Sequence, residues 1–283
     1  MAISPYAEII LKKCQSPEAF ATLSDEEKNV LRNVAKGSSR LMCDNSFLGR
    51  KKPTEKEEGV KFYTFSLPRI LSCPGSTTIC QRRCYQRTPE EMLKQSNRDS
   101  AVVNSRKLNL FLSLQSDFVN RISDEIKRKK PALNEKLIVR IHPSGDFYST
   151  DYFKKWLKIA LVTRLYGKQY DFVAYTKSFS IIDEVLGDQG CLKTLYQEAY
   201  EAAKVDLVQK DELKFSDFNI NIIASYMDDT SDEAKYIAHK WSLPVYYATE
   251  NNEPGLEDCE GKPCANCMKC YQFPMKDVTT KLR

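Results

Sequence analysis

The chain has 283 residues, of which 42% are hydrophobic and 29% charged, with a net charge of +5. This length can bury the core of one principal domain, and the composition is that of a soluble globular protein. We find no apolar run of about 18 residues and no signal-peptide pattern at the start, so we expect a cytoplasmic protein that does not enter a membrane. The modest positive charge permits nucleic acid as a partner without requiring it.

Residues 1–60 predict a helical N-terminal appendage followed by a linker. Ser24 precedes a segment with apolar residues at helical spacing, which is typical of a capped helix start. Residues 48–60 are charged, contain Pro53 and lack periodicity, so we interpret them as a loop that separates the appendage from the main domain.

Residues 61–250 alternate between predicted strands and predicted helices, which indicates right-handed crossovers and a parallel sheet. Polar loops follow every strand, and this favours a partial (β/α) barrel over a doubly wound sheet. The predicted fold class is therefore α/β, with a C-terminal cysteine-rich segment at residues 251–283. The five predicted strands are Lys61–Ser66, Leu137–Ile141, Asp171–Tyr175, Asn219–Ala224 and Pro244–Tyr247.

Three cysteines, Cys73, Cys80 and Cys84, follow the first predicted strand with gaps of six and three residues. In the cytoplasm such cysteines are better interpreted as ligands than as disulfides. Three thiolates are one fewer than the four that usually close a zinc or cubane site, so a [4Fe–4S] cluster here would keep one iron open. Unligated loop cysteines are the alternative.

A second motif, Cys259-x4-Cys264-x2-Cys267-x2-Cys270, supplies four thiols within twelve residues. Its C-x2-C-x2-C core is typical of ferredoxin-like cluster ligands, whereas zinc sites usually join two cysteine pairs through a longer spacer. We therefore expect a second [4Fe–4S] cluster, with zinc as the alternative. In either case the site can be a closed structural one.

Polar residues at the ends of the next strands complete the candidate site. His142, Asp146 and Lys177 are the candidate catalytic residues, because an imidazole, a carboxylate and an amine can each move or hold a proton. A tight turn with helix caps is the alternative for both loops. Asp228, Asp229 and Glu250 are further acids at strand ends. The candidate cofactor-binding residues are Ser144, Gly145, Asp146, Thr176, Ser178 and Ser225.

Several motifs together resemble the gene product eighty-eight family of phages and mobile elements, over about residues 38–273. This resemblance implies expression in the cytoplasm of a bacterial host. The motifs are Phe65-Ser-Leu-Pro68, the Cys73–Cys84 loop, Ser144-Gly-Asp146-Phe147, Tyr175-Thr-Lys-Ser178 and the terminal cysteine run.

The layout is also similar to that of the radical S-adenosylmethionine superfamily, although the usual cysteine gaps there are three and two residues. The resemblance implies that Cys73, Cys80 and Cys84 hold the active cluster and that Gly145 and Asp146 hold S-adenosylmethionine. Reductive cleavage of this cofactor would then generate a substrate radical, with a flavodoxin or ferredoxin as reductant.

Two other classes of protein stay open. A nonenzymatic nucleic-acid-binding protein would use structural Fe–S or zinc sites to hold a basic scaffold, and its binding would depend on salt. An iron–sulfur transfer or redox protein would need no substrate pocket, so the polar strand ends make it the third choice.

Overall fold

The fold is given by a computed structural model, which describes residues 4–36, 39–43, 59–84, 98–129, 131–132, 135–167, 170–251, 254–259, 268–271 and 276–281. None of the described helices has the length and apolarity needed to cross a membrane. The helices are α1 (Pro5–Lys13), α2 (Pro17–Ala21), α3 (Asp25–Ala35), α5 (Thr78–Arg82), α7 (Arg98–Ser113), α8 (Phe118–Arg128), α9 (Thr150–Tyr166), α10 (Phe179–Gly187), α11 (Gln189–Ala203) and α12 (Asp232–Lys240), with 3₁₀ turns η1 (Phe215–Phe218) and η2 (Lys269–Tyr271).

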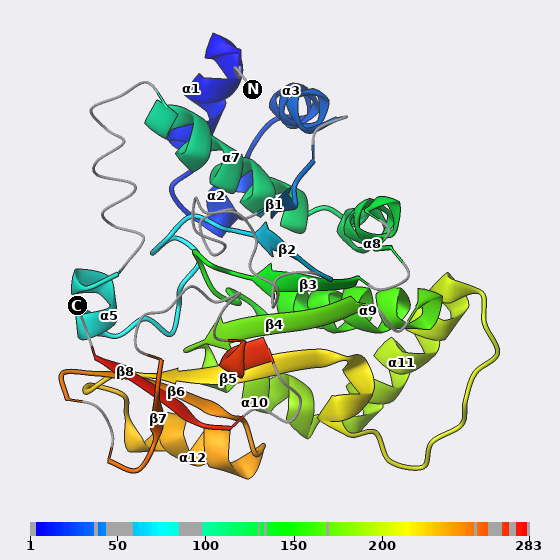
Figure 1. Cartoon of the computed structure of the whole chain (residues 1–283). Coiled ribbons are helices and arrows are strands. Elements are labelled where there is room, and N and C mark those ends of the chain that lie inside the picture. The colour runs from blue at the N-terminus through cyan, green and yellow to red at the C-terminus, as the bar shows by residue number, and fades with distance from the viewer. Residues whose placement is uncertain are drawn as a thin grey trace.

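One sheet of eight strands, ordered β1-β2-β3-β4-β5-β6-β8-β7, forms the centre of the molecule (Figure 1). Only the edge strand β1 is antiparallel to its neighbour, and the other seven strands are all parallel. Within the described residues β1 and β7 do not pair with each other, so the sheet stays open and the α/β prediction is confirmed. The strands are β1 (Met42–Cys43), β2 (Val60–Phe65), β3 (Lys136–Ile141), β4 (Tyr170–Thr176), β5 (Ile220–Tyr226), β6 (Val245–Thr249), β7 (Glu257–Asp258) and β8 (Val278–Lys281).

The five predicted parallel strands all appear, and β8 adds a sixth strand that continues their spatial order. Its four residues pair one to one with four residues of β6, beginning with Val278 opposite Tyr246. The run Val278–Lys281 is too short and too polar to show a strand pattern, which is why the sequence did not reveal it.

The outer face of the sheet packs against the helices through aromatic side chains. Because side chains alternate along a strand, Phe65 and Ile141 point to this face. The ring of Phe65 lies 5.3 Å from that of Trp156 on α9 and 5.6 Å from that of Phe118 on α8, both edge to face. Ser149 begins α9 by accepting a hydrogen bond from the Tyr152 amide. These contacts fix α8 and α9 behind the first two parallel strands.

The inner face carries a smaller apolar cluster to which residues 268–271 contribute. Phe62 and Ile138 belong to it, together with Cys270 and Tyr271. The rings of Phe62 and Tyr271 meet edge to face at 5.1 Å. Residues 268–271 are therefore held against the inner face although they lie more than 200 positions from β2 in the sequence.

The N-terminal helices pack at the β1 end of the sheet beside α7 (Figure 1). Phe20 of α2 lies 5.9 Å from Phe111 of α7, and Ile10 and Leu31 join the same core. The predicted capping of α3 is present, because Ser24 and Glu27 form a reciprocal capping box. This appendage thus shares one hydrophobic core with the main domain.

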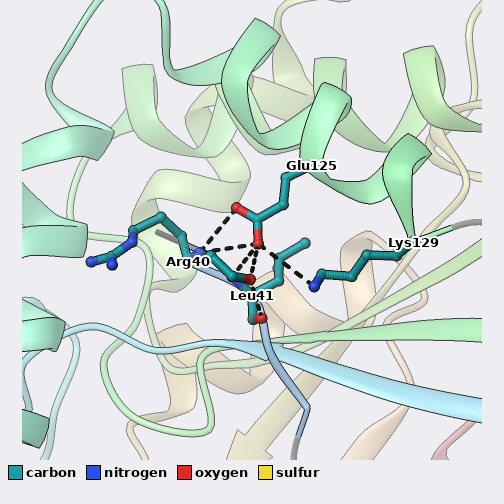
Figure 2. Close-up of polar contacts among 5 residues, drawn as sticks. Arg40, Leu41, Glu125 and Lys129 are labelled. Carbon is teal, nitrogen blue, oxygen red and sulfur yellow. Dashed lines mark hydrogen bonds and ion pairs between the residues drawn. The ribbon is translucent and has the colours of Figure 1, made fainter. Parts of the chain in front are cut away.

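A buried glutamate connects the segment before β1 to α8 (Figure 2). The Glu125 carboxylate accepts hydrogen bonds from the backbone N–H groups of Arg40 and Leu41 at 2.9–3.0 Å and from the Ser39 hydroxyl. Lys129 Nζ lies 4.0 Å from the same carboxylate. Because backbone donors that lose their partner inside a protein are costly, this carboxylate anchors the chain as it enters the sheet.

We expect Glu125→Gln to lower the free energy of unfolding by about 1–3 kcal/mol, because the amide nitrogen cannot accept the bonds that a carboxylate oxygen accepts. Urea denaturation measures the change. The matched control is Glu198→Gln, whose carboxylate is half exposed and pairs with Lys158, and it should change stability by less than about 1 kcal/mol. Equal effects of both substitutions would contradict the anchoring role.

Candidate functional site

The candidate site lies where β2, β3, β4 and β5 end. Their register is aligned, since Phe65 pairs with Ile141 and Ile141 pairs with Ala174. The strands are parallel, so the loops that follow them meet at one edge of the sheet. These loops contain the first cysteine motif and most of the predicted residues, whereas Thr176 ends β4 and Ser225 lies within β5.

Asp146 connects these loops through its carboxylate. Oδ1 accepts hydrogen bonds from the Phe147 amide and the Thr176 hydroxyl, both at 2.7 Å, and Oδ2 accepts one from the Lys177 amide at 2.8 Å. Its own amide donates to the Ser72 carbonyl at 2.8 Å. Burial raises the pKa of Asp146, and the three donors oppose that rise. A carboxylate with so many partners positions the loops around it.

Gly145 and Ser144 bring the second loop against the first. Gly145 has φ +89°, and a Cβ there would lie 2.6 Å from both Leu67 Cβ and Ser72 Oγ, so this turn requires glycine. The Leu67 amide donates to the Ser144 carbonyl at 2.8 Å. The Ser144 hydroxyl is buried and has no hydrogen-bond partner among the described residues.

The first cysteine motif forms a loop that leads into α5. Thr77 caps this helix by accepting from the Cys80 amide at 3.1 Å. Asp229, from the loop after β5, accepts from the Ile79 amide at 2.8 Å. Partial burial opposes ionisation of Asp229, but hydrogen bonds from Ile79 and Thr77 lower its pKa. Glu250, after β6, pairs with Arg83 of the same loop at 3.7 Å, so the structure brings two of the predicted strand-end acids to the cysteine loop.

Gly75 sets how closely this loop approaches β4. A Cβ on Gly75 would lie 2.0 Å from the Lys177 carbonyl oxygen and 2.9 Å from the Ser178 amide nitrogen. Both of these atoms belong to the backbone and cannot turn away as a side chain can. The motif alone gave no role to Gly75 or Thr77, because their partners lie about 100 to 150 residues further along the chain.

The thiols of Cys73, Cys80 and Cys84 are free and lie near one another. Burial raises the pKa of Cys73 to about 12, and Asp146 and the other two thiols contribute to this rise through their charges. Within the part of the chain that the structure describes, no three His, Cys, Asp or Glu side chains are arranged to hold a metal ion. The structure therefore gathers the predicted thiols at one place without the close packing of a single-ion site.

Lys177 places a buried ammonium group near the cysteine loop, where its charge acts on Cys80. Its Nζ donates to the carbonyl and the hydroxyl of Ser225, the latter at 3.0 Å. Burial lowers the pKa of Lys177, whereas the charges of Cys80, Asp146 and Asp229 oppose that shift. Two predicted residues, Lys177 and Ser225, are therefore in direct contact.

Thr176 and Ser178 complete the loop after β4. The Thr176 hydroxyl accepts from the Ser178 amide at 3.0 Å while it donates to Asp146. Ser178 stands at the start of α10 but makes no side-chain cap bond, so the capping alternative is wrong for its hydroxyl. That hydroxyl is buried and without a hydrogen-bond partner in the described structure.

His142 lies on the helix side of the sheet. Its Nε2 is 2.8 Å from the Tyr152 hydroxyl, and its ring contacts Phe147 and Trp156 edge to face. Burial lowers the pKa of His142 to about 3, so the ring is neutral at physiological pH. The ring is thus part of the aromatic core behind the loops.

The second cysteine motif is only partly within the described residues, and Cys264 and Cys267 lie outside them. The Cys259 amide donates to the Thr279 carbonyl of β8 at 2.8 Å, and Cys270 is buried on the inner face. Burial raises the pKa of Tyr246, and the charges of Cys259 and Cys270 add to this rise. Both described cysteines are therefore close to β6.

An open, mainly parallel sheet with a thiol-containing loop at its carboxyl edge places this chain among α/β proteins whose strand-end loops meet at one edge. The chain belongs to the Gene product 88 family, whose model matches residues 39–273. It is similar to the Gene 88 protein of Mycobacterium phage D29, with 29% identity over 211 residues, which cover 71% of this chain and 78% of that protein. No solved structure matches.

We expect Gly75→Ala to destabilise the protein by about 1–3 kcal/mol, because the new methyl group would overlap the Lys177 backbone. It should also speed alkylation of Cys80 in the native protein, since the loop must move away from β4. Denaturation and mass spectrometry measure the two effects. Gly187→Ala is the control, because a Cβ there meets nothing within 4 Å, and the same behaviour in both variants would disprove the close approach.

The buried neutral imidazole predicts a pH dependence of stability. The folded-state pKa of His142 is about 3, below the ordinary value of 6.5, so the unfolded chain binds the extra proton between these values. Stability from this group is complete above pH 6.5 and falls by up to about 1.4 kcal/mol per pH unit as the pH drops toward 3. In His142→Asn this slope should be smaller at every pH in the window, as measured by urea denaturation, and an unchanged slope would refute the assignment.

Proposed function

We propose that this protein binds a [4Fe–4S] cluster through Cys73, Cys80 and Cys84 and uses its open iron to bind S-adenosylmethionine, as a radical-forming enzyme. The observation that carries the proposal is the position of the three free thiols. They follow β2, which begins the run β2-β3-β4-β5-β6-β8 of parallel strands whose order in the sheet is also their order in the chain. They also lie near the loop that contains Gly145 and Asp146.

The donor set is consistent with a cluster. Thiolates favour iron–sulfur centres, zinc and cuprous copper. A single zinc ion draws its ligands to about 2.3 Å, whereas a cubane distributes three cysteines over three different irons and so needs them further apart. Three thiols gathered at one place are therefore a donor set of the kind that iron–sulfur clusters use.

Buried hydroxyls beside the thiols support a bound polar ligand. The hydroxyls of Ser144 and Ser178 have no partner among the described residues, and such groups are costly unless something satisfies them. Asp146 already accepts three hydrogen bonds from the protein. In this proposal Asp146 mainly shapes the loop, and the hydroxyls of Ser144 and Ser178 bind S-adenosylmethionine.

The chemistry that such a cluster supplies is one-electron reduction of S-adenosylmethionine, which releases methionine and a 5′-deoxyadenosyl radical that removes hydrogen from a substrate. A flavodoxin or ferredoxin of the host would deliver the electron. Cys259, Cys264, Cys267 and Cys270 would hold the second cluster, or zinc in its place.

The test is anaerobic reconstitution of the wild-type protein and of Cys80→Ala with iron and sulfide. We expect the substitution to remove roughly four irons per chain and to abolish both the S-adenosylmethionine-dependent EPR change and formation of 5′-deoxyadenosine. Cys191→Ala, on α11, is the matched control and should retain all three. Full cleavage activity in Cys80→Ala, or a wild-type cluster that does not respond to the cofactor, would reject the proposal.

A further inference from the structure

Lys177 is a buried cation whose direct partners are neutral. Its Nζ donates to the Ser225 carbonyl and hydroxyl, and only 9% of the residue is exposed. Among the described residues, no carboxylate forms an ion pair with this ammonium. Burying a charge without a paired countercharge costs several kcal/mol, so the fold keeps this cation at an energetic cost.

The negative groups around this ammonium belong to the cysteine loop and its supports. Cys80, Asp146 and Asp229 are the groups whose charges act on Lys177, with Cys80 the strongest of the three. Lys177 also lines one cavity with Gly75 and Thr77 of the cysteine loop, and its charge lowers the pKa of Cys80 against the effect of burial. The ammonium is therefore placed to act on a thiolate at position 80.

The backbone fixes the distance between this cation and the loop. The Lys177 amide is held by Asp146, and the Lys177 carbonyl lies against Gly75, where no Cβ would fit. At the other end of the side chain, Ser225 of β5 holds Nζ. Both ends of Lys177 are thus restrained, so the charge cannot swing away into solvent.

From this geometry we infer that Lys177 is a positioning residue that sets the reduction potential of the cluster held by Cys73, Cys80 and Cys84. Its fixed positive charge stabilises the reduced state of the cluster and so raises the reduction potential. The inference rests on the proposed function. A cluster gains negative charge when it is reduced, and a nearby cation in a site of low dielectric constant favours that state. Hydrogen bonding and charge around the sulfur ligands are among the means by which proteins set such potentials.

The competing explanation is that Lys177 only connects β4 to β5 through Ser225. Three substitutions separate the two roles. Lys177→Gln removes the charge but keeps a donor for Ser225, Lys177→Met removes both, and Lys177→Arg keeps the charge. Lys158→Met is the matched control, since this lysine pairs with Glu198 on the helix side of the sheet.

The experiment measures iron and sulfide content and then the midpoint potential by EPR-monitored redox titration, without S-adenosylmethionine. We expect the midpoint potential to shift to more negative values in both Lys177→Gln and Lys177→Met. It should stay near that of the wild type in Lys177→Arg and in Lys158→Met.

If the midpoint potential of Lys177→Gln equalled that of the wild type, the inference would be overturned. Lys177 would then only connect β4 to β5 through Ser225. Loss of folding in both neutral variants, seen by circular dichroism, would overturn it as well, because it would assign Lys177 to stability. A wild-type protein that takes up no cluster would instead reject the proposed function. The two failures are therefore distinguishable.

Discussion

The carboxylate of Asp146 is the constraint on which the edge of the sheet depends. The carboxylate accepts hydrogen bonds from Phe147 in its own loop after β3 and from Thr176 and Lys177 at the end of β4. The backbone amide of Asp146 donates to Ser72 in the loop after β2. Burying a carboxylate is unfavourable unless its lone pairs find donors, so this carboxylate requires the loops after β3 and β4 to be in place together. One residue, through its side chain and its backbone amide, thereby couples the cysteine loop to the rest of the site.

Two glycines make that coupling possible at short range. Gly145 allows the second loop to lie against Leu67 and Ser72, and Gly75 allows the cysteine loop to lie against the backbone at Lys177. In both places the neighbour is close enough that any side chain would overlap it. The backbone of each glycine therefore lies directly against a neighbouring segment, which gives the thiols a defined setting and keeps Lys177 next to the cysteine loop.

The two cysteine motifs occupy different parts of the same sheet. The first lies at the carboxyl edge, where strand-end loops converge, and the described part of the second lies against the inner face at Phe62 and next to β8. The helices cover the other face through Phe65 and Trp156. Among the described residues, Cys270 and Tyr271 of η2 provide part of the cover of the inner face.

The sequence by itself determined the α/β class, the order of five parallel strands, the family and the gathering of strand-end loops at one edge. It could do so because the alternation of strand and helix patterns is local and because parallel strands end on the same side. The capping box at Ser24 was equally local. The thiols, Asp146 and Lys177 were predicted in the same way, as polar residues that follow strands, whereas Ser225 lies within β5.

Only the tertiary structure decided what these residues contact. His142 follows a strand as Asp146 does, yet its ring turns into the aromatic core at Tyr152, because a left-handed backbone conformation at φ 58° directs it there. The contacts of Gly75 with Lys177 and of Asp229 with Ile79 join residues about 100 to 150 positions apart. The short strand β8 forms where it pairs with β6 on one side and β7 on the other. Such contacts depend on which groups meet after folding, and a local pattern carries no information about partners so far along the chain.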